Sequence, residues 1–546
     1  MNSYYDLGNY SRSISTESPE SQLWFDRGLL WNYGYHHEEA IECFKKSLEY
    51  DPTCVMAHWG IAYASGPNYN KKWGDFDDDE KQTCLRDTHG AVANAKKNLG
   101  QASDLEIGLI EALEQRYPND ASIEDFGPWN DAFADAMRKI YQDHPDDMDI
   151  CTIFAEAIMN RTPWKLWDLP TGKPAAGADT LEAIDVLETA FTSLADQGSN
   201  QHPGLLHMYL HLMEMSPHPE KALNAGDSLI ELVPDAGHLL HMATHVDVLC
   251  GDYQNVVLRN QKAIQADQKY LARSGPMNFY TIYRCHNYHF KIYGAMFLGQ
   301  MQVAVDTADE LTDSLTRDVL EPMADWLEPF YPMKQHVLIR FGKWDEIKAQ
   351  TPPEDTNFYA MTTALIHYAK TVACAATGDI PGAEAARIDF RAAKAAVPET
   401  RMLFNNTCTD ILGVAEAMLE GELSYRKGDF DEAFDHLRCS VALDDNLPYD
   451  EPWGWMQPTR HALGALLLEQ NRIEEAEAIY RADLGFDDTL ARACQHPNNV
   501  WSLHGMHECL SRLGRDEEAT LLKTQLDIAL ARADVEIKYS CYCRGM

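Results

Sequence analysis

Apolar residues recur along most of the chain with the spacing of one helical face. Three stretches show this well, because each has an apolar-periodic segment, a polar turn containing Gly and a second periodic segment. They are residues 249–264, 297–311 and 376–390. We find no alternation of apolar and polar residues long enough to indicate a useful strand. The pattern therefore predicts an all-α fold built from helical hairpins.

The segment from Trp24 to Pro52 follows the pattern of a tetratricopeptide repeat (TPR). A bulky residue opens the first helix of such a unit, a small residue allows close crossing, an Ala and an aromatic pack the second helix, and Pro ends it. The matching residues are Trp24, Gly28, Trp31, Ala40, Phe44, Ser47 and Pro52. Only Ser47 is a loose match, since Ala is usual at that position.

Weaker copies of the repeat follow toward the C-terminus. One contains Gly421, Gly428, Ala433 and Leu437, the next Gly464, Ala476 and Tyr480, and a further one opens with Trp501 and Gly505. A helical pair in such an array buries its apolar face only against its neighbours. We therefore expect one continuous TPR-like superhelix of stacked helical hairpins.

The pattern suggests five segments along this superhelix. These are a flexible N-terminus at 1–20, N-terminal repeats at 21–160, central His-rich repeats at 161–310, C-terminal repeats at 311–535 and a tail at 536–546. Three stretches rich in Pro, Gly and aromatic residues interrupt the helices, at 65–76, 162–177 and 447–458. Long loops of this kind either form the walls and lids of a pocket or cap exposed helix ends.

Composition narrows the choice of partners and compartment. The 546 residues include 46 Lys and Arg against 85 Asp and Glu, which gives a formal charge of −39 and excludes nucleic acid as the main partner. No apolar run approaches the roughly 18 residues of a membrane span, and the polar N-terminus does not resemble a secretory leader. The 13 Cys lack a disulfide framework, so we expect a cytoplasmic protein. The tail motif Ser540–Cys543 fits a thiol or metal hook, or an exposed, inert end.

Histidines cluster in the middle of the chain. Nine of the 21 lie between His202 and His289. If a helix begins at Pro203, one of its faces carries His207, His211 and Glu214. A second helical segment presents His238, His241 and His245, and a third presents His286 and His289. We expect these to be successive helices, whose side chains can reach a shared ion because packed helix axes lie about 8–10 Å apart.

A metal ion explains the cluster economically. Buried imidazole nitrogens each need a partner, and one ion satisfies several lone pairs at once. The predicted ligands are His207, His211, His238, His241, His245, His286 and His289. A donor set this rich in imidazole favours copper, in one or two ions, with iron or zinc as alternatives. The other interpretation is a metal-free groove in which histidine moves protons or binds a ligand.

These residues resemble a family of large TPR-containing proteins of bacteria and fungi. The resemblance rests on HPGLLHMYLHLMEMS, PDAGHLLHMATHVDV and YRCHNYHF, whose family forms are HPGxxHxxxHxxE, HxxHMxxH and HNxH. This chain departs at Ala243–Thr244, where the family often has Pro-Ser, and at His58, where it commonly has an aromatic. The resemblance implies the helical fold and the metal site but no particular reaction. Some fungal relatives resemble tailoring proteins of secondary metabolism.

Our first functional hypothesis is therefore a metal-dependent oxidase or oxygenase acting on a small organic molecule. Glu214 is a candidate ligand, acceptor for an imidazole N–H, or base, and Asn287 is a candidate for substrate binding. The predicted pocket walls are His58, Trp59, Tyr63, Trp164, Trp167, Trp453 and Trp455. The alternatives are a non-catalytic TPR scaffold that binds a peptide and a metal carrier. Whether the chain forms a homodimer is left open.

Overall fold

The computed structural model describes residues 4–199 and 201–545, and the chain divides into two compact units. Unit 1 comprises Met1–Val246 and Lys262–Tyr280, and unit 2 comprises Asp247–Gln261 and Thr281–Met546. We expected one uninterrupted stack of hairpins. The division instead falls inside the segment predicted at 161–310.

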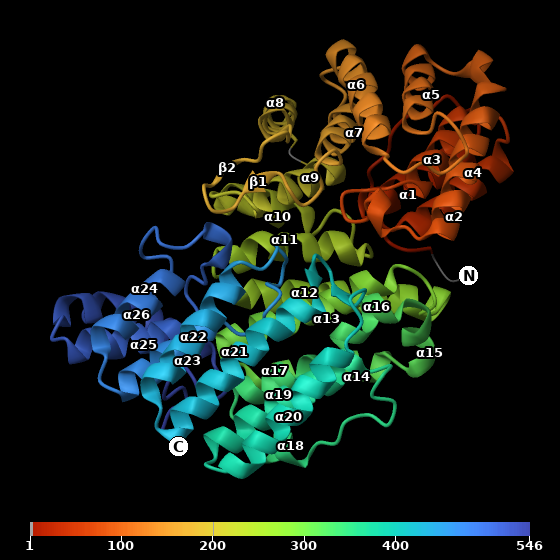
Figure 1. Ribbon diagram of the computed structural model, residues 1–546. Coiled ribbons are helices and arrows are strands. Elements are labelled where there is room, and N and C mark those ends of the chain that lie inside the picture. The colour runs from red at the N-terminus through yellow and green to blue at the C-terminus, as the bar shows by residue number, and fades with distance from the viewer. Residues whose placement is uncertain (1–3, 200, 546) are drawn as a thin grey trace. The chain divides into compact units, whose positions relative to one another are not determined.

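Unit 1 is helical apart from one short strand pair, in the residues that the structure describes (Figure 1). Its elements are α1 (Pro19–Tyr33), α2 (His37–Tyr50), α3 (Val55–Ser65), α4 (Asp78–Lys96), α5 (Asp104–Arg116), α6 (Gly127–Asp143), α7 (Met148–Met159), β1 (Trp167–Asp168), β2 (Lys173–Pro174), α8 (Thr180–Asp196), α9 (Pro203–Glu214) and α10 (Leu223–Leu229). The strands pair antiparallel, Trp167 opposite Pro174. Both α11 (Gly237–Leu249) and α12 (Tyr253–Ser274) cross from one unit into the other.

Unit 2 is likewise helical apart from one short strand pair, in the residues that the structure describes. It contains α13 (Thr281–Leu298), α14 (Met301–Ser314), α15 (Arg317–Leu320), α16 (Ala324–Leu327), α17 (Met333–Arg340), α18 (Trp344–Ala349), α19 (Ala360–Ala376), α20 (Ile380–Ala396), β3 (Met402–Leu403), β4 (Asn406–Thr407), α21 (Cys408–Lys427), α22 (Phe430–Asp445), α23 (Thr459–Glu469), α24 (Ile473–Asp483), α25 (Val500–Arg512) and α26 (Asp516–Arg532). Helices adjacent in sequence pack together, as the pairs α19–α20 and α21–α22 show in Figure 1. The all-α prediction is confirmed.

Glycines let the hairpin helices cross closely, as the repeat pattern predicts. The Phe44 ring of α2 lies between Gly28 of α1 and Gly60 of α3, where an added Cβ would come within 2.5 and 2.6 Å of it. No side chain larger than hydrogen fits there without displacing the ring. Ser47 stands at the usual Ala position because its hydroxyl donates to the Ser21 carbonyl at 2.8 Å.

The C-terminal copies use the same device. Tyr480 of α24 packs against Gly464 of α23 and Gly505 of α25, where an added Cβ would lie 2.5 and 2.3 Å from the ring. Gly421 of α21 faces Leu437 of α22 in the same way, at 2.7 Å. These are the positions that the sequence pattern singled out.

Both ends of the chain differ from expectation. Residues 4–18, predicted as part of a flexible terminus, are tied to unit 1, since Arg12 pairs with Asp149 at 2.6 Å and the Asp6 N–H donates to Asp235 at 2.8 Å; residues 1–3 lie outside the described part. The tail is neither a free thiol hook nor an exposed end. Cys541 and Cys543 form a disulfide, and Cys543 is 1% exposed.

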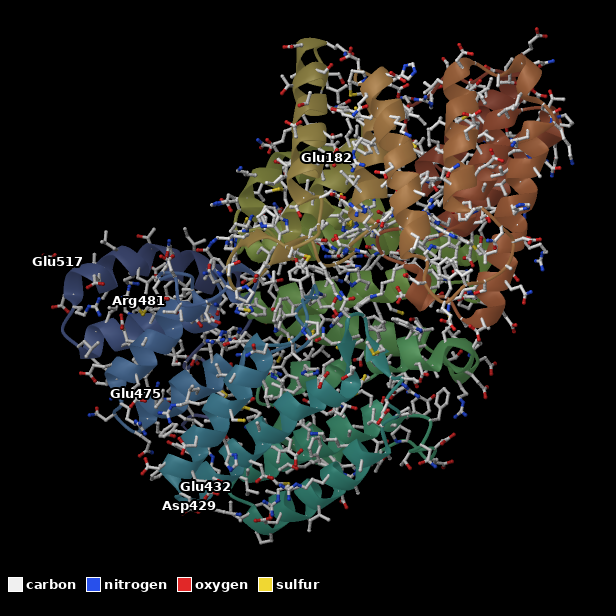
Figure 2. All side chains as sticks on the ribbon, turned by 45° about the horizontal axis from the view of Figure 1, so that its top comes forward. Glu182, Asp429, Glu432, Glu475, Arg481 and Glu517 are labelled. Atoms are coloured by element: carbon white, nitrogen blue, oxygen red, sulfur yellow. A yellow bond between two sulfur atoms is a disulfide. The ribbon has the colours of Figure 1, made fainter. Side chains whose placement is uncertain are left out.

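Acidic residues occupy the first turns of several helices. The first turns of four helices contain such residues, which are labelled in Figure 2: Glu182 of α8, Glu432 of α22, Glu475 of α24 and Glu517 of α26. A carboxylate there is stabilised by the positive end of the helix dipole. Part of the large negative charge therefore serves to begin helices. In the part of the chain described, none of the helices is long and apolar enough to cross a bilayer.

Candidate metal centre

Helix α9 begins where the sequence predicts. Pro203 occupies its first turn, and the His202 Nδ1 accepts from the Leu205 N–H at 3.1 Å as the N-terminal cap. The helix places His207, His211 and Glu214 on one face. All three are buried, at 0, 0 and 1% exposure.

Helix α11 supplies the second set of imidazoles. His238, His241 and His245 are also buried. The prediction of successive helices is wrong in one respect: α10 lies between α9 and α11, and α12 lies between α11 and α13. The histidine-bearing helices alternate with others along the chain.

Three imidazoles from the two helices come together within unit 1. One ring nitrogen each from His207, His211 and His238 lies within 4.8 Å of the others. The Nε2 atoms of His207 and His238 are 3.2 Å apart. His211 Nε2 is buried and has no hydrogen-bond partner among the described residues. A single ion among these atoms would engage all three lone pairs.

The neighbours of His207 and His211 fix the tautomers that this requires. His207 Nδ1–H donates to the Tyr33 carbonyl at 2.6 Å, because a carbonyl can only accept. His211 Nδ1–H donates in the same way to Glu214 Oε1 at 2.9 Å. In a neutral imidazole the other nitrogen then carries the lone pair. Both Nε2 atoms therefore carry a lone pair. That of His207 accepts from His238 Nε2–H at 3.2 Å, and a bound metal ion would take the place of this proton.

Glu214 contacts two histidines with its two oxygens. Its Oε2 lies 2.6 Å from His245 Nδ1, while Oε1 accepts from His211. His245 Nε2 in turn lies 2.8 Å from His241 Nε2. A carboxylate in this place orients imidazoles and raises their basicity, which is how metal-binding histidines are commonly held.

Burial keeps the imidazoles of His207, His211 and His238 uncharged. Desolvation, and next the neighbouring His211, hold the pKa of His207 well below its ordinary value. The pKa of His211 is lowered by burial and by His245, and that of His238 by burial and by His207. Neutral imidazoles can bind a cation, whereas imidazolium ions would repel it.

Aromatic rings enclose the three histidines. The Tyr35 ring centroid lies 4.6 Å from that of His207 and 5.7 Å from that of His238. Tyr69 lies 4.9 Å from His211, and Trp164 lies 5.9 Å from it. Tyr35 and Trp164 have positive φ values of 53° and 60°, a conformation that costs energy for residues other than Gly.

Trp164 is thus a predicted wall residue that does lie beside a predicted ligand. Tyr35 and Tyr69 were missed. Tyr69 lies in the stretch 65–76 that interrupts the helices, and the aromatic content of this loop could have identified it as a wall residue. Tyr35 lies in the turn between α1 and α2, and only the Gly and aromatic composition of that turn could have marked it.

The other predicted wall residues of unit 1 have different surroundings. Trp59 stacks on Tyr63 at 4.9 Å, and the Tyr63 hydroxyl donates to Glu156. Trp167 Nε1 donates to the Leu212 carbonyl at 2.7 Å and so fastens the β1 loop to α9. His58 is half-buried on α3, where it lines a broad cavity together with Glu42.

The remaining predicted site residues belong to unit 2. On α13, His286 lies 4.7 Å from Phe404 between ring centroids, His289 Nε2 lies 2.8 Å from Met456 Sδ, and Asn287 is buried. Trp453 Nε1 donates to the Asp444 carbonyl at 3.0 Å, and Trp455 packs 5.0 Å from His336. Burial, then His336, lowers the pKa of His289 to about 3.

Comparison with known proteins identifies one repeat. The tetratricopeptide repeat family matches residues 36–54, which include α2 and overlap the unit predicted from Trp24 to Pro52. Among curated proteins, none matches this chain.

Several solved structures resemble the chain weakly. Yeast Tom70 is 12% identical with a TM-score of 0.28, the match covering 94% of this chain and 98% of that one. The Cut9–Hcn1 hetero-tetramer of APC/C is 13% identical with a TM-score of 0.27, and the match covers 95% of this chain and 94% of that one. Naa15/Naa10 bound to HypK-THB is 13% identical with a TM-score of 0.21, and the match covers 93% of this chain and 70% of that one. Likenesses this low carry no conclusion about activity or partners.

Proposed function

We propose that the protein is a helical-repeat scaffold that holds a transition-metal ion in unit 1. The repeat at residues 36–54 supports the scaffold. The main support for the metal is that buried ring nitrogens of His207, His211 and His238 lie within 4.8 Å of one another.

The cost of burial favours a metal over simple packing. A polar nitrogen removed from water without a partner destabilises a protein by about 1–3 kcal/mol. His211 Nε2 is such an atom, and it belongs to the group of three. Residues selected only for packing would be apolar at the centre of two helices this hydrophobic.

Copper is the metal that we propose, with iron or zinc as the alternatives. The three ligand atoms are all imidazole nitrogens, and copper(II) binds such sets more tightly than the other divalent first-row metals. A cytoplasmic location accompanies this proposal. It is supported by the small number of disulfides, since Cys541–Cys543 is the only one among the described residues.

Oxidase or oxygenase activity on a small organic molecule is the second candidate. Three protein ligands leave coordination positions for other groups, and Tyr35, Tyr69 and Trp164 provide aromatic walls beside them. The scaffold or carrier proposal requires the ion but no turnover. The two are separated by whether the loaded protein consumes oxygen.

The test is copper binding to the full chain. We expect copper bound in stoichiometric amount, measured by equilibrium dialysis and elemental analysis, and lost in His207→Ala and His211→Ala. His218→Ala is the matched control, because His218 is 61% exposed and pairs with Glu220 on the surface. Circular dichroism checks that each variant is folded. Wild-type protein that stays metal-free, or equal binding by all variants, contradicts the proposal.

An oxygen electrode then separates scaffold from oxidase. Loaded protein that consumes oxygen with a panel of phenols and amines, and stops doing so in His207→Ala, supports the oxidase. Metal binding without any consumption supports the scaffold.

A further inference from the structure

A cavity of about 480 Å³ lies in unit 1 against α2 and α4. It is separate from the three histidines and from every pocket residue predicted from the sequence. Ligand sites of small molecules have volumes of about 300–1,000 Å³. The cavity is therefore of a size that holds a small organic molecule.

The cavity is strongly acidic. Its side chains include the carboxylates of Glu38, Asp77, Asp79, Glu80 and Asp87 against a single ammonium, that of Lys71. Burial lowers the pKa of both His36 and His37 to about 3, so these two lining residues add no positive charge at neutral pH. A cation is attracted into such a cavity, and an anion is repelled.

The cavity already accommodates an ammonium ion. Lys71 Nζ lies 4.0 Å from the ring centroid of Phe279 and 4.3 Å from that of Phe76. The same atom lies 3.1 Å from Glu80 Oε1. Two aromatic faces and a carboxylate around one ammonium are the elements by which proteins recognise organic cations.

His36 gives an independent indication of a ligand. Its side chain is 2% exposed, and neither ring nitrogen has a hydrogen-bond partner among the described residues. The ring lines the cavity and stacks on Tyr280 at 3.7 Å. A neutral imidazole in this position can accept a hydrogen bond from an ammonium N–H.

Two walls of the cavity also touch the histidine cluster. Tyr35 packs against His207, and the Tyr280 hydroxyl accepts from the His238 backbone N–H at 3.0 Å. A ligand in the cavity would therefore share walls with the candidate metal site.

We propose that this cavity binds a small organic cation with a primary ammonium group, and that Lys71 is an internal occupant which the ligand displaces. The proposal does not depend on a bound metal. We expect the ligand to be a free small molecule rather than a lysine side chain of a protein partner, because the cavity volume matches that of a small ligand.

Calorimetric titration of the full chain tests this with two matched probes. n-Butylammonium reproduces the end of a lysine side chain, and 1-butanol has the same shape without the charge. We expect butylammonium to bind at least about tenfold more tightly than butanol. Lys71→Met removes the internal competitor and keeps its stem, so binding should tighten about tenfold further.

Lys72→Met is the control, since Lys72 is exposed and does not line the cavity; it should bind like the wild type. Phe279→Leu should weaken binding. Equal affinity for the two probes, or equal behaviour of the two lysine variants, overturns the proposal. So does a lysine-containing pentapeptide that binds tenfold more tightly than butylammonium. Copper binding is measured in parallel, so a failure here is distinct from a failure of the metal site.

Discussion

Individual hydrogen bonds prepare the histidine cluster for a cation. The Tyr33 carbonyl and Glu214 Oε1 each accept from an Nδ1–H, and this leaves the Nε2 atoms of His207 and His211 with their lone pairs. The arrangement depends on these two oxygens accepting. A residue that can donate at the same place would disturb it.

Glu214→Gln tests this directly. The amide matches the carboxylate in shape, but its NH₂ would face one of the two imidazoles that Glu214 now contacts. We expect copper affinity to fall about 10–100-fold, as measured by competition with a chelator, while circular dichroism stays unchanged. Glu220→Gln, on the surface beside His218, is the control. Unchanged affinity would show that Glu214 does not position the ligands.

A second residue-scale prediction concerns Asp444 in unit 2. Burial, and next the charge of Asp445, raise its pKa from 3.8 to about 8. The folded protein therefore keeps this proton over a pH range in which the unfolded chain releases it. Rising pH then favours unfolding, so stability from this group is present below pH 4 and is lost as pH rises toward 8.

Asp444→Asn should remove this pH dependence. Between pH 5 and 8 the free energy of unfolding of the wild type should fall relative to the variant by up to about 1.4 kcal/mol per pH unit. Urea unfolding at several pH values measures it. Asp431→Asn, at a fully exposed position, should show no such trend. A constant difference between wild type and Asp444→Asn across this range would contradict the prediction.

At the scale of helices, close crossing at glycine determines how the hairpins pack. Within α21, Gly421 faces Leu437 so closely that an added Cβ would lie 2.7 Å from it. Gly413 of the same helix has nothing within 4 Å of that position. The two residues form a matched pair in one helix.

Substitution by Ala should therefore have opposite effects. Gly421→Ala forces the helices apart and should destabilise the protein by about 1–3 kcal/mol. Gly413→Ala adds helix propensity without a clash and should stabilise it by about 0.5–1 kcal/mol. Thermal and urea unfolding measure both. Shifts in the same direction would mean that crossing distance does not limit packing here.

The start of a helix and the residues on one of its faces can be predicted from the sequence more readily than contacts between distant helices. Pro203 marks the start of α9, and the spacing of His207, His211 and Glu214 places them on one face, because both facts are local. The contact between Tyr35 and His207 is not local. It depends on how distant helices stack, and no periodicity within one helix records that.

For the whole molecule, the repeat pattern predicts the all-α architecture but not its division into two units. A repeat pattern describes how each hairpin packs on the next, whereas a division depends on where that packing is interrupted. The binding of residues 4–18 along unit 1 also escaped prediction, since a polar terminal segment looks flexible until its partners, such as Asp149, are known. Unit 1 nevertheless contains five of the seven predicted ligands.

X-ray absorption at the copper edge tests the metal centre most directly, because it reports the ligands themselves. For the copper-loaded full chain, we expect scattering from three imidazole rings. His218→Ala should give the same spectrum, whereas His207→Ala should retain no copper at this site. A spectrum without imidazole scattering, or one left unaltered by the loss of His207, would contradict a metal centre at His207, His211 and His238.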